Sequence, residues 1–191
     1  YNMGNAFKEQ GKLEDATEAY KKCISLDPNY VFAYNNLGSA LQEQCKVDEA
    51  ITAYNQALLL KPDHAEAYNN MGVALQEQCK VDEAITAYNH ALLLKPDYAE
   101  AYNNMGVALR DQGKVDEAID AYNKCISLKP DHAEAYNNMG MTYQYQGKLV
   151  NAIDAYNKAT SIKPDYARAH QNLSYALLNS GSLQEGLDQY E

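Results

Sequence analysis

Cysteine and histidine are the side chains of this sequence best suited to metal binding or nucleophilic catalysis, and the chain has four of each. The cysteines form no CxxC pair, and no Cys/His cluster has the spacing of a zinc site. No histidine pairs with a cysteine or a carboxylate at a spacing that repeats along the chain. The glycines are isolated and do not form a phosphate-binding loop. We therefore predict no active site, no metal site and no cofactor. We interpret Cys23, Cys45, Cys79 and Cys125 as free thiols, which favours the cytoplasm or another reducing compartment.

A second set of side chains, the amides of paired asparagines, could form hydrogen bonds with a polypeptide backbone. The pairs are Asn35-Asn36, Asn69-Asn70, Asn103-Asn104 and Asn137-Asn138. Asparagine is a poor helix former, because its side chain competes for backbone hydrogen bonds. Each amide nevertheless offers donors and an acceptor, so a row of amides can bind an extended peptide whatever its side chains are. Whether the amides form such a row depends on the elements that carry them.

Those elements recur every 34 residues along the whole chain. Prolines stand at this interval, at Pro28, Pro62, Pro96, Pro130 and Pro164. Glycines do the same at Gly4, Gly38, Gly72, Gly106 and Gly140, and tyrosines at Tyr20, Tyr54, Tyr88, Tyr122, Tyr156 and Tyr190. Such a period predicts an array of structural repeats in which each unit buries its apolar surface against its neighbours.

Each repeat contains two segments of helical periodicity, as at 65–78 and 82–95, where apolar residues recur on one side. Asp82 and Glu83 begin the second segment and Lys95 ends it, which suits the helix dipole, and Pro96 stops the helix. We therefore predict two helices per repeat in a single array. It has a part-repeat at 1–30, full repeats at 31–64, 65–98, 99–132 and 133–166, and a part-repeat at 167–191.

The repeat resembles the tetratricopeptide repeat, and the matching residues are Tyr68, Met71-Gly72, Leu75, Ala84, Tyr88, Ala91 and Pro96. The resemblance covers the whole chain, with tyrosine where the family often has tryptophan. It implies an all-α fold, a right-handed superhelical solenoid of antiparallel helix pairs whose first helices line a concave groove. Gly72 and Ala84 would lie where the two helices of a pair cross. The implied function is that of a non-enzymatic protein–protein interaction scaffold that binds an extended peptide in this groove.

On a helical wheel the asparagines fall on the side of the first helix opposite to its packed side, so we expect them on the groove wall. The second asparagines would form a column that resembles the asparagine ladder in the repeat arm of O-linked N-acetylglucosamine transferases. Alternatively, the asparagines belong to the architecture of the repeat and bind no peptide. An apolar strip and flanking carboxylates accompany them, which suits a neutral or basic segment. The predicted peptide-binding residues are Asn36, Asn70, Asn104, Asn138, Asn172, Asn35, Asn69, Asn103, Asn137, Val73, Val107, Met141, Glu66, Glu100 and Glu134.

The composition excludes several other classes of partner. The net charge is −10, which argues against nucleic acid and against an anionic membrane surface. No segment approaches the roughly 18 consecutive apolar residues of a membrane span. Some members of the family bind a carboxylate tail through cations in this groove. This sequence has Glu66 and Asn69 there, so we expect no such recognition.

Two other functions stay open at this point. The chain could be the substrate-selecting arm of a larger enzyme, such as a glycosyltransferase of the kind named above. It could also be a structural spacer that associates end to end, because both ends fall inside a repeat and no polar capping helix is evident. The same observation leads us to expect a piece of a longer protein.

The cysteines give two conformational predictions. Cys45 and Cys79 stand where the other repeats have glycine, at the turn between the two helices. We expect a positive φ there, which costs a cysteine roughly 1 kcal/mol. Cys23 and Cys125 replace a recurrent alanine and are expected in the core.

Overall fold

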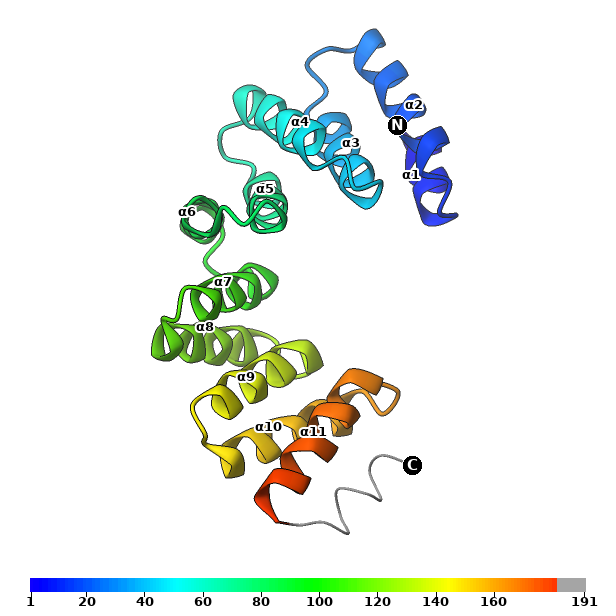
Figure 1. Cartoon of the computed structure of the whole chain (residues 1–191). Coiled ribbons are helices and arrows are strands. Elements are labelled where there is room, and N and C mark those ends of the chain that lie inside the picture. Colours follow the sequence, from blue (N-terminus) through cyan, green and yellow to red (C-terminus); the bar gives the residue numbers. More distant parts are fainter. Residues whose placement is uncertain (182–191) are drawn as a thin grey trace. The chain divides into compact units, whose positions relative to one another are not determined.

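The computed structural model describes residues 1–181, and in this range every regular element is an α-helix (Figure 1). The chain forms two compact units, Tyr1–Pro96 and the part that starts at Asp97. The helices of the first unit are α1 (Asn2–Glu9), α2 (Leu13–Leu26), α3 (Val31–Glu43), α4 (Val47–Leu60), α5 (Ala65–Glu77) and α6 (Val81–Leu94). Those of the second unit are α7 (Ala99–Asp111), α8 (Val115–Leu128), α9 (Ala133–Tyr145), α10 (Leu149–Ile162) and α11 (Ala167–Ser180).

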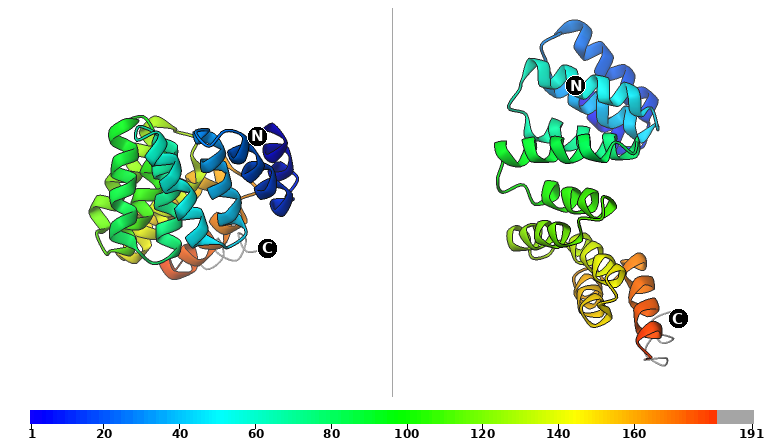
Figure 2. Two further views of the ribbon diagram at one scale, coloured as in Figure 1. Left: turned by 90° about the horizontal axis from the view of Figure 1, so that it is seen from above. Right: turned by 60° about the vertical axis from the view of Figure 1, so that its left-hand side comes forward.

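Consecutive helices of each unit pack as antiparallel pairs, and Figure 2 shows the same helices from two further directions. The two predicted segments of the repeat at 65–78 and 82–95 correspond to α5 and α6, so this prediction is confirmed. First helices of neighbouring repeats also contact each other, since α5 contacts α3, and α9 contacts both α7 and α11. The first helices therefore form a continuous face within each unit.

A tyrosine of the second helix fills the space above a glycine of the first helix in each pair. A Cβ atom added to Gly72 would lie 2.6 Å from Cε1 of Tyr88, and a Cβ atom added to Gly38 would lie 2.6 Å from Cε1 of Tyr54. These tyrosines are at most 1% exposed, and Ala84 is fully buried. The prediction that Gly72 lies where the two helices meet is therefore confirmed, and the ring explains why no larger residue occupies this position.

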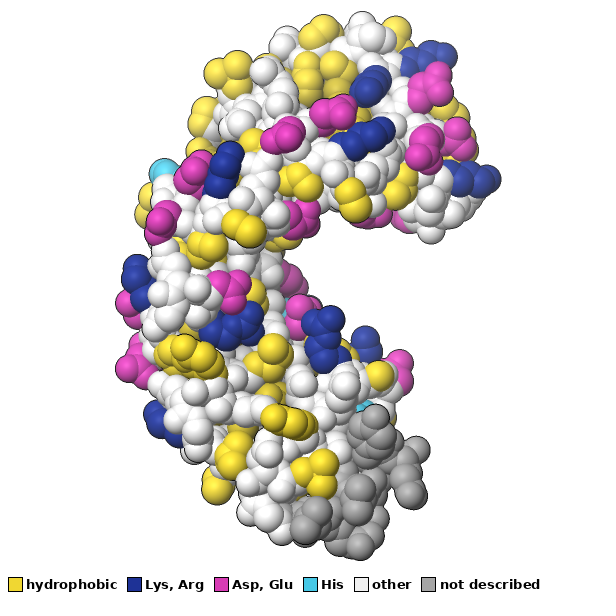
Figure 3. All heavy atoms as spheres, in the orientation of Figure 1, with side chains coloured by type: hydrophobic (Ala, Val, Ile, Leu, Met, Phe, Trp, Pro, Cys, Tyr) yellow, Lys and Arg dark blue, Asp and Glu magenta, His cyan; other side chains and the backbone are white. Residues whose placement is uncertain are grey.

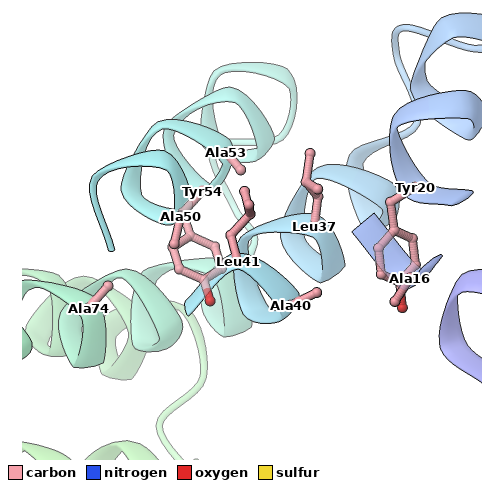
Figure 4. Close-up of a cluster of buried hydrophobic side chains, with 9 residues drawn as sticks. All are labelled: Ala16, Tyr20, Leu37, Ala40, Leu41, Ala50, Ala53, Tyr54 and Ala74. Carbon is pink, nitrogen blue, oxygen red and sulfur yellow. The ribbon is translucent and has the colours of Figure 1, made fainter. Parts of the chain in front are cut away.

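The core continues from one repeat into the next. In the first unit it contains side chains from α2, α3, α4 and α5, as Figure 4 shows around Tyr20 and Tyr54. Leu41 of α3 lies in this cluster with Ala50 of the paired helix and Ala74 of the following repeat. Because each repeat covers the apolar side of its neighbour, no single helix pair has a complete core of its own.

The turns between paired helices confirm the conformation predicted for the cysteines. The φ angles are 60° for Cys45 and 59° for Cys79, beside 78° for the equivalent Gly113. Both thiols are exposed. Glycine adopts this left-handed conformation without steric cost, whereas the Cβ of cysteine makes it unfavourable.

The prediction for the other two cysteines is confirmed for Cys125 only. Cys125 is buried between Ala99 and Ala135, and burial raises the pKa of its thiol to about 12. Cys23 is half-buried, so its predicted core position is wrong. Ala99 packs against Cys125, whereas no residue of the described range 1–181 stands in the equivalent place beside Cys23.

Candidate functional site

The asparagines form hydrogen bonds between neighbouring repeats. Within each unit, the asparagine at the second position of the pair, which in α11 follows Gln171, donates from its Nδ2 to Oδ1 of the first asparagine in the preceding repeat. The distances are 3.2 Å for Asn70 to Asn35, 3.1 Å for Asn138 to Asn103 and 2.9 Å for Asn172 to Asn137. Asn36 makes a similar bond of 3.0 Å to Asn5. The amides therefore link adjacent first helices, and they lie in a row along the face of each unit.

The first asparagine of each pair is not on a groove wall, and this part of the prediction is wrong. Asn35, Asn69, Asn103 and Asn137 are 9%, 6%, 3% and 0% exposed. The following first helix of the same unit covers Asn35, Asn103 and Asn137, and a wheel drawn for a single helix does not include this neighbour. These buried carbonyl oxygens need a hydrogen-bond partner, and Asn35, Asn103 and Asn137 receive it from the following repeat.

The second asparagines remain closer to the surface. Asn36, Asn70, Asn104 and Asn172 are half-buried, whereas Asn138 is 8% exposed. Oδ1 of Asn70 accepts a long bond of 3.4 Å from Asn69, and its Nδ2 donates to Asn35. An amide has two N–H groups and two lone pairs, so these two bonds use half of its capacity. The orientation of the Asn70 amide is thus fixed while donor and acceptor capacity remains.

The apolar strip beside the asparagines becomes more exposed in the second unit. Val73 and Val107 are half-buried, whereas Met141 is 36% exposed and Tyr175, the next residue of the strip, is 58% exposed. The Asn137 amide contacts the Met141 sulfur at 3.7 Å. The strip therefore offers apolar side chains to a ligand mainly on α9 and α11.

Sequence reasoning missed one large residue on this face, Tyr145, which is 77% exposed. It stands in α9 where the preceding repeats have Glu77 and Asp111. The sequence does indicate this residue, because a tyrosine replaces the carboxylate that the two preceding repeats have at this position. Tyr145 and Met141 line a hollow of about 560 Å³ together with Arg110, Asp111, Gln112 and Gly113.

Two of the predicted carboxylates are paired with lysines. Glu66 lies 3.5 Å from Nζ of Lys95, and Glu100 lies 3.2 Å from Nζ of Lys129. Glu134 is exposed. The lysines stand at the C-terminal ends of the second helices, so the acidic character expected from Glu66 and Glu100 is largely compensated. In Figure 3, acidic and basic side chains are interspersed with hydrophobic ones on the side that faces the viewer.

The buried tyrosines that contact the repeat glycines differ in their hydrogen bonds. Tyr54 donates to Oε1 of Gln42 at 3.0 Å, and Tyr156 donates to Gln144 at 2.8 Å. Arg110 occupies the equivalent position beside Tyr122 and cannot accept a hydrogen bond. The hydroxyl of Tyr122 accordingly has no partner of acceptable geometry within residues 1–181. Burial raises the pKa of Tyr122 to about 12, an effect that the nearby positive charge of Arg110 reduces.

Residues 1–181 contain no group of three or more histidine, cysteine, aspartate or glutamate side chains that could hold a metal ion. In the same range, every helix is too short or too polar to cross a lipid bilayer.

Comparison with family models gives two matches. A model described as Tetratricopeptide repeat matches residues 30–96, 63–131 and 97–165, and a model described as TPR repeat matches residues 4–44. No curated protein sequence matches the chain.

Several solved structures are similar to this chain. MamA is 31% identical with a TM-score of 0.74, over 87% of this chain and 97% of MamA. YrrB, described as a TPR protein with an unusual peptide-binding site, is 27% identical with a TM-score of 0.68, over 88% of this chain and 87% of YrrB. PilW, a widely conserved type IV pilus biogenesis factor, is 22% identical with a TM-score of 0.91, over 98% of this chain and 87% of PilW, and shares the fold.

Proposed function

Because the chain belongs to the tetratricopeptide repeat family, we propose that it is a non-catalytic scaffold that holds an extended segment of a partner protein along its first helices. Family membership confirms the predicted all-α solenoid of antiparallel helix pairs. Membership of this family also makes the chain a protein-interaction scaffold in the general sense. YrrB, which is similar to this chain, is a TPR protein with an unusual peptide-binding site.

The observation that carries the proposal is the row of oriented amides. Asn70 in the first unit and Asn172 in the second are half-buried, and an inter-repeat hydrogen bond fixes each of them. Their remaining donors and acceptors suit the backbone N–H and C=O groups of an extended segment. Because the amides are already oriented, binding costs little further side-chain entropy. Backbone contacts of this kind are independent of the sequence of the segment.

The net charge of the chain indicates which charge the bound partner segment has. A net charge of −10 favours a neutral or basic partner through long-range attraction. Glu66 and Glu100 add little to this preference, since Lys95 and Lys129 neutralise them. The apolar strip on α9 and α11 then supplies contact area beside the amides.

The test is a pull-down of random linear peptides with three forms of the chain. The first is the intact chain, and the second is Asn70→Ala/Asn172→Ala. The third, Asn55→Ala/Asn157→Ala, is the matched control, because it also removes two asparagine amides but takes them from exposed positions of the second helices α4 and α10. Circular dichroism and thermal melts establish that all three are folded at the assay temperature.

We expect the intact chain and the control to retain a common set of peptides that Asn70→Ala/Asn172→Ala loses. If both variants lose them equally, the loss is not specific to the asparagine row and this part of the proposal is wrong. If neither variant loses them, peptides bind without the asparagine row and this part of the proposal is wrong.

A further inference from the structure

The hollow beside Tyr145 differs from the equivalent place in the other repeats. In the second unit, α9 contributes Met141 and Tyr145 to its wall, and the end of α7 contributes Arg110 and Asp111. The repeat before has Val107 and Asp111 where α9 has Met141 and Tyr145. A half-buried aliphatic residue and a carboxylate are thus replaced by two large side chains. Tyr145 is 77% exposed and Met141 is 36% exposed, so both are accessible to a ligand.

The two charges in the hollow neutralise each other. The Arg110 guanidinium donates to Oδ1 of Asp111 from Nε at 3.3 Å and from Nη2 at 2.9 Å. An acidic ligand group would therefore compete with Asp111 for the arginine, and a basic group would compete with Arg110 for the carboxylate. Neither finds an unpaired counter-charge, so the hollow favours an uncharged side chain.

The remaining chemistry of the wall suits an aromatic ring. A phenol ring packs against another ring edge to face or offset, a thioether contacts ring edges favourably, and a planar guanidinium stacks on ring faces. Tyr145, Met141 and Arg110 provide these three groups within one hollow. An aliphatic side chain would use the apolar area but gain none of these directional contacts.

Two of the three groups are held in position before any ligand arrives. The Met141 sulfur contacts the buried Asn137 amide at 3.7 Å, and Asn137 accepts a hydrogen bond from Asn172. Arg110 is held by its pair with Asp111, and its side chain is 21% exposed. A ligand therefore meets a wall whose side chains are already partly ordered, which reduces the entropic cost of binding.

We infer that this hollow binds one aromatic side chain of the extended partner segment. The asparagine row holds the backbone of that segment, and the hollow selects its sequence. The inference rests on the proposed function, because it specifies the ligand of the same face.

The first experiment selects random linear peptides on the intact chain and records the residues that are enriched. We expect one position with tryptophan, tyrosine or phenylalanine in most of the retained peptides. The chain contains no tryptophan, so the fluorescence of a tryptophan in a selected peptide reports binding when it is excited at a wavelength that the 17 tyrosines of the chain hardly absorb. Replacing that aromatic residue with alanine should weaken binding roughly tenfold or more, as for a buried aromatic anchor.

The second experiment changes the protein. Met141→Val/Tyr145→Asp gives the hollow the residues found one repeat earlier and should weaken binding of the aromatic peptide by the same factor. The alanine peptide should bind the variant and the intact chain equally. Val150→Asp is the control, because it also replaces an exposed apolar residue of this repeat with the equivalent aspartate, but at the start of α10. It should leave both affinities unchanged.

Two results would overturn the inference while the proposed function stands. One is a set of retained peptides without aromatic enrichment, and the other is an equal loss of both peptides in Met141→Val/Tyr145→Asp. Failure of the intact chain to retain any peptide would overturn the inference and the proposed function together.

Discussion

The unpaired hydroxyl of Tyr122 predicts that a single substitution stabilises the protein. Arg110→Gln places an acceptor where Gln42 and Gln144 accept from Tyr54 and Tyr156 in other repeats. An unsatisfied buried polar group costs about 1–3 kcal/mol, and a new hydrogen bond contributes about 0.5–1.5 kcal/mol. The lost ion pair to Asp111 is partly exposed and is worth about 0–1 kcal/mol. We therefore expect the free energy of unfolding to rise by about 1 kcal/mol.

The assay is urea unfolding followed by circular dichroism, with the reverse substitution as the matched partner. Gln76→Arg removes the acceptor of the Tyr88 hydroxyl and should lower the free energy of unfolding by about 1–2 kcal/mol. The phenylalanine variants separate this effect from other consequences of the arginine. Tyr122→Phe should be neutral or stabilising, whereas Tyr88→Phe should destabilise by about 0.5–1.5 kcal/mol. Equal effects of the two phenylalanine variants, or no gain with Arg110→Gln, would refute the reasoning.

Three further predictions concern stability. Cys45→Gly and Cys79→Gly should each raise the free energy of unfolding by about 1 kcal/mol, since glycine adopts the observed positive φ without strain; urea midpoints that stay the same or fall would contradict this. Gly72→Ala should lower it by about 1–3 kcal/mol, because the new Cβ would lie 2.6 Å from the Tyr88 ring; a more stable variant would mean that the helix propensity of alanine prevails. Burial lowers the pKa of His64 below its ordinary 6.5, so the unfolded chain binds more protons than the folded chain as the pH falls below 6.5, and the free energy of unfolding decreases. His64→Tyr should remove this part of the pH dependence of the urea midpoint. The same pH profile in the intact chain and the variant would contradict this prediction.

The repeat pattern predicted the fold because its residues act within one helix pair. Gly72 faces Tyr88 across a pair, and the positive φ of Cys79 belongs to a single turn. Such features depend only on residues that are close in sequence. Each repeat therefore needs the same residue types at the same positions, and these residues coincide when the sequence is compared with itself at an offset of 34 residues.

The asparagines required knowledge of the neighbouring repeat. Asn103 and Asn104 are adjacent on the helix surface, and a wheel places both opposite to the packed side. Asn103 is 3% exposed nevertheless, because the next first helix covers it and Asn138 of that helix donates a hydrogen bond to it. Tyr145 was missed for a different reason, since it occurs once and so gives no periodic signal. The residues of the candidate site that recur in every repeat were thus predicted, whereas the residue that occurs in one repeat only was missed.

The inter-repeat bond between asparagines has a consequence for cooperativity. The Tyr54 to Gln42 bond joins two helices of one repeat, whereas Asn70 to Asn35 joins one repeat to the next. In a nearest-neighbour description, the first contributes to the intrinsic stability of a repeat and the second to the coupling between repeats. Strong coupling makes repeats unfold together, and weak coupling lets them unfold one at a time. A segment bound along the asparagines would contact several repeats at once and so strengthen the coupling between them. Binding would then make the repeats of a unit unfold together.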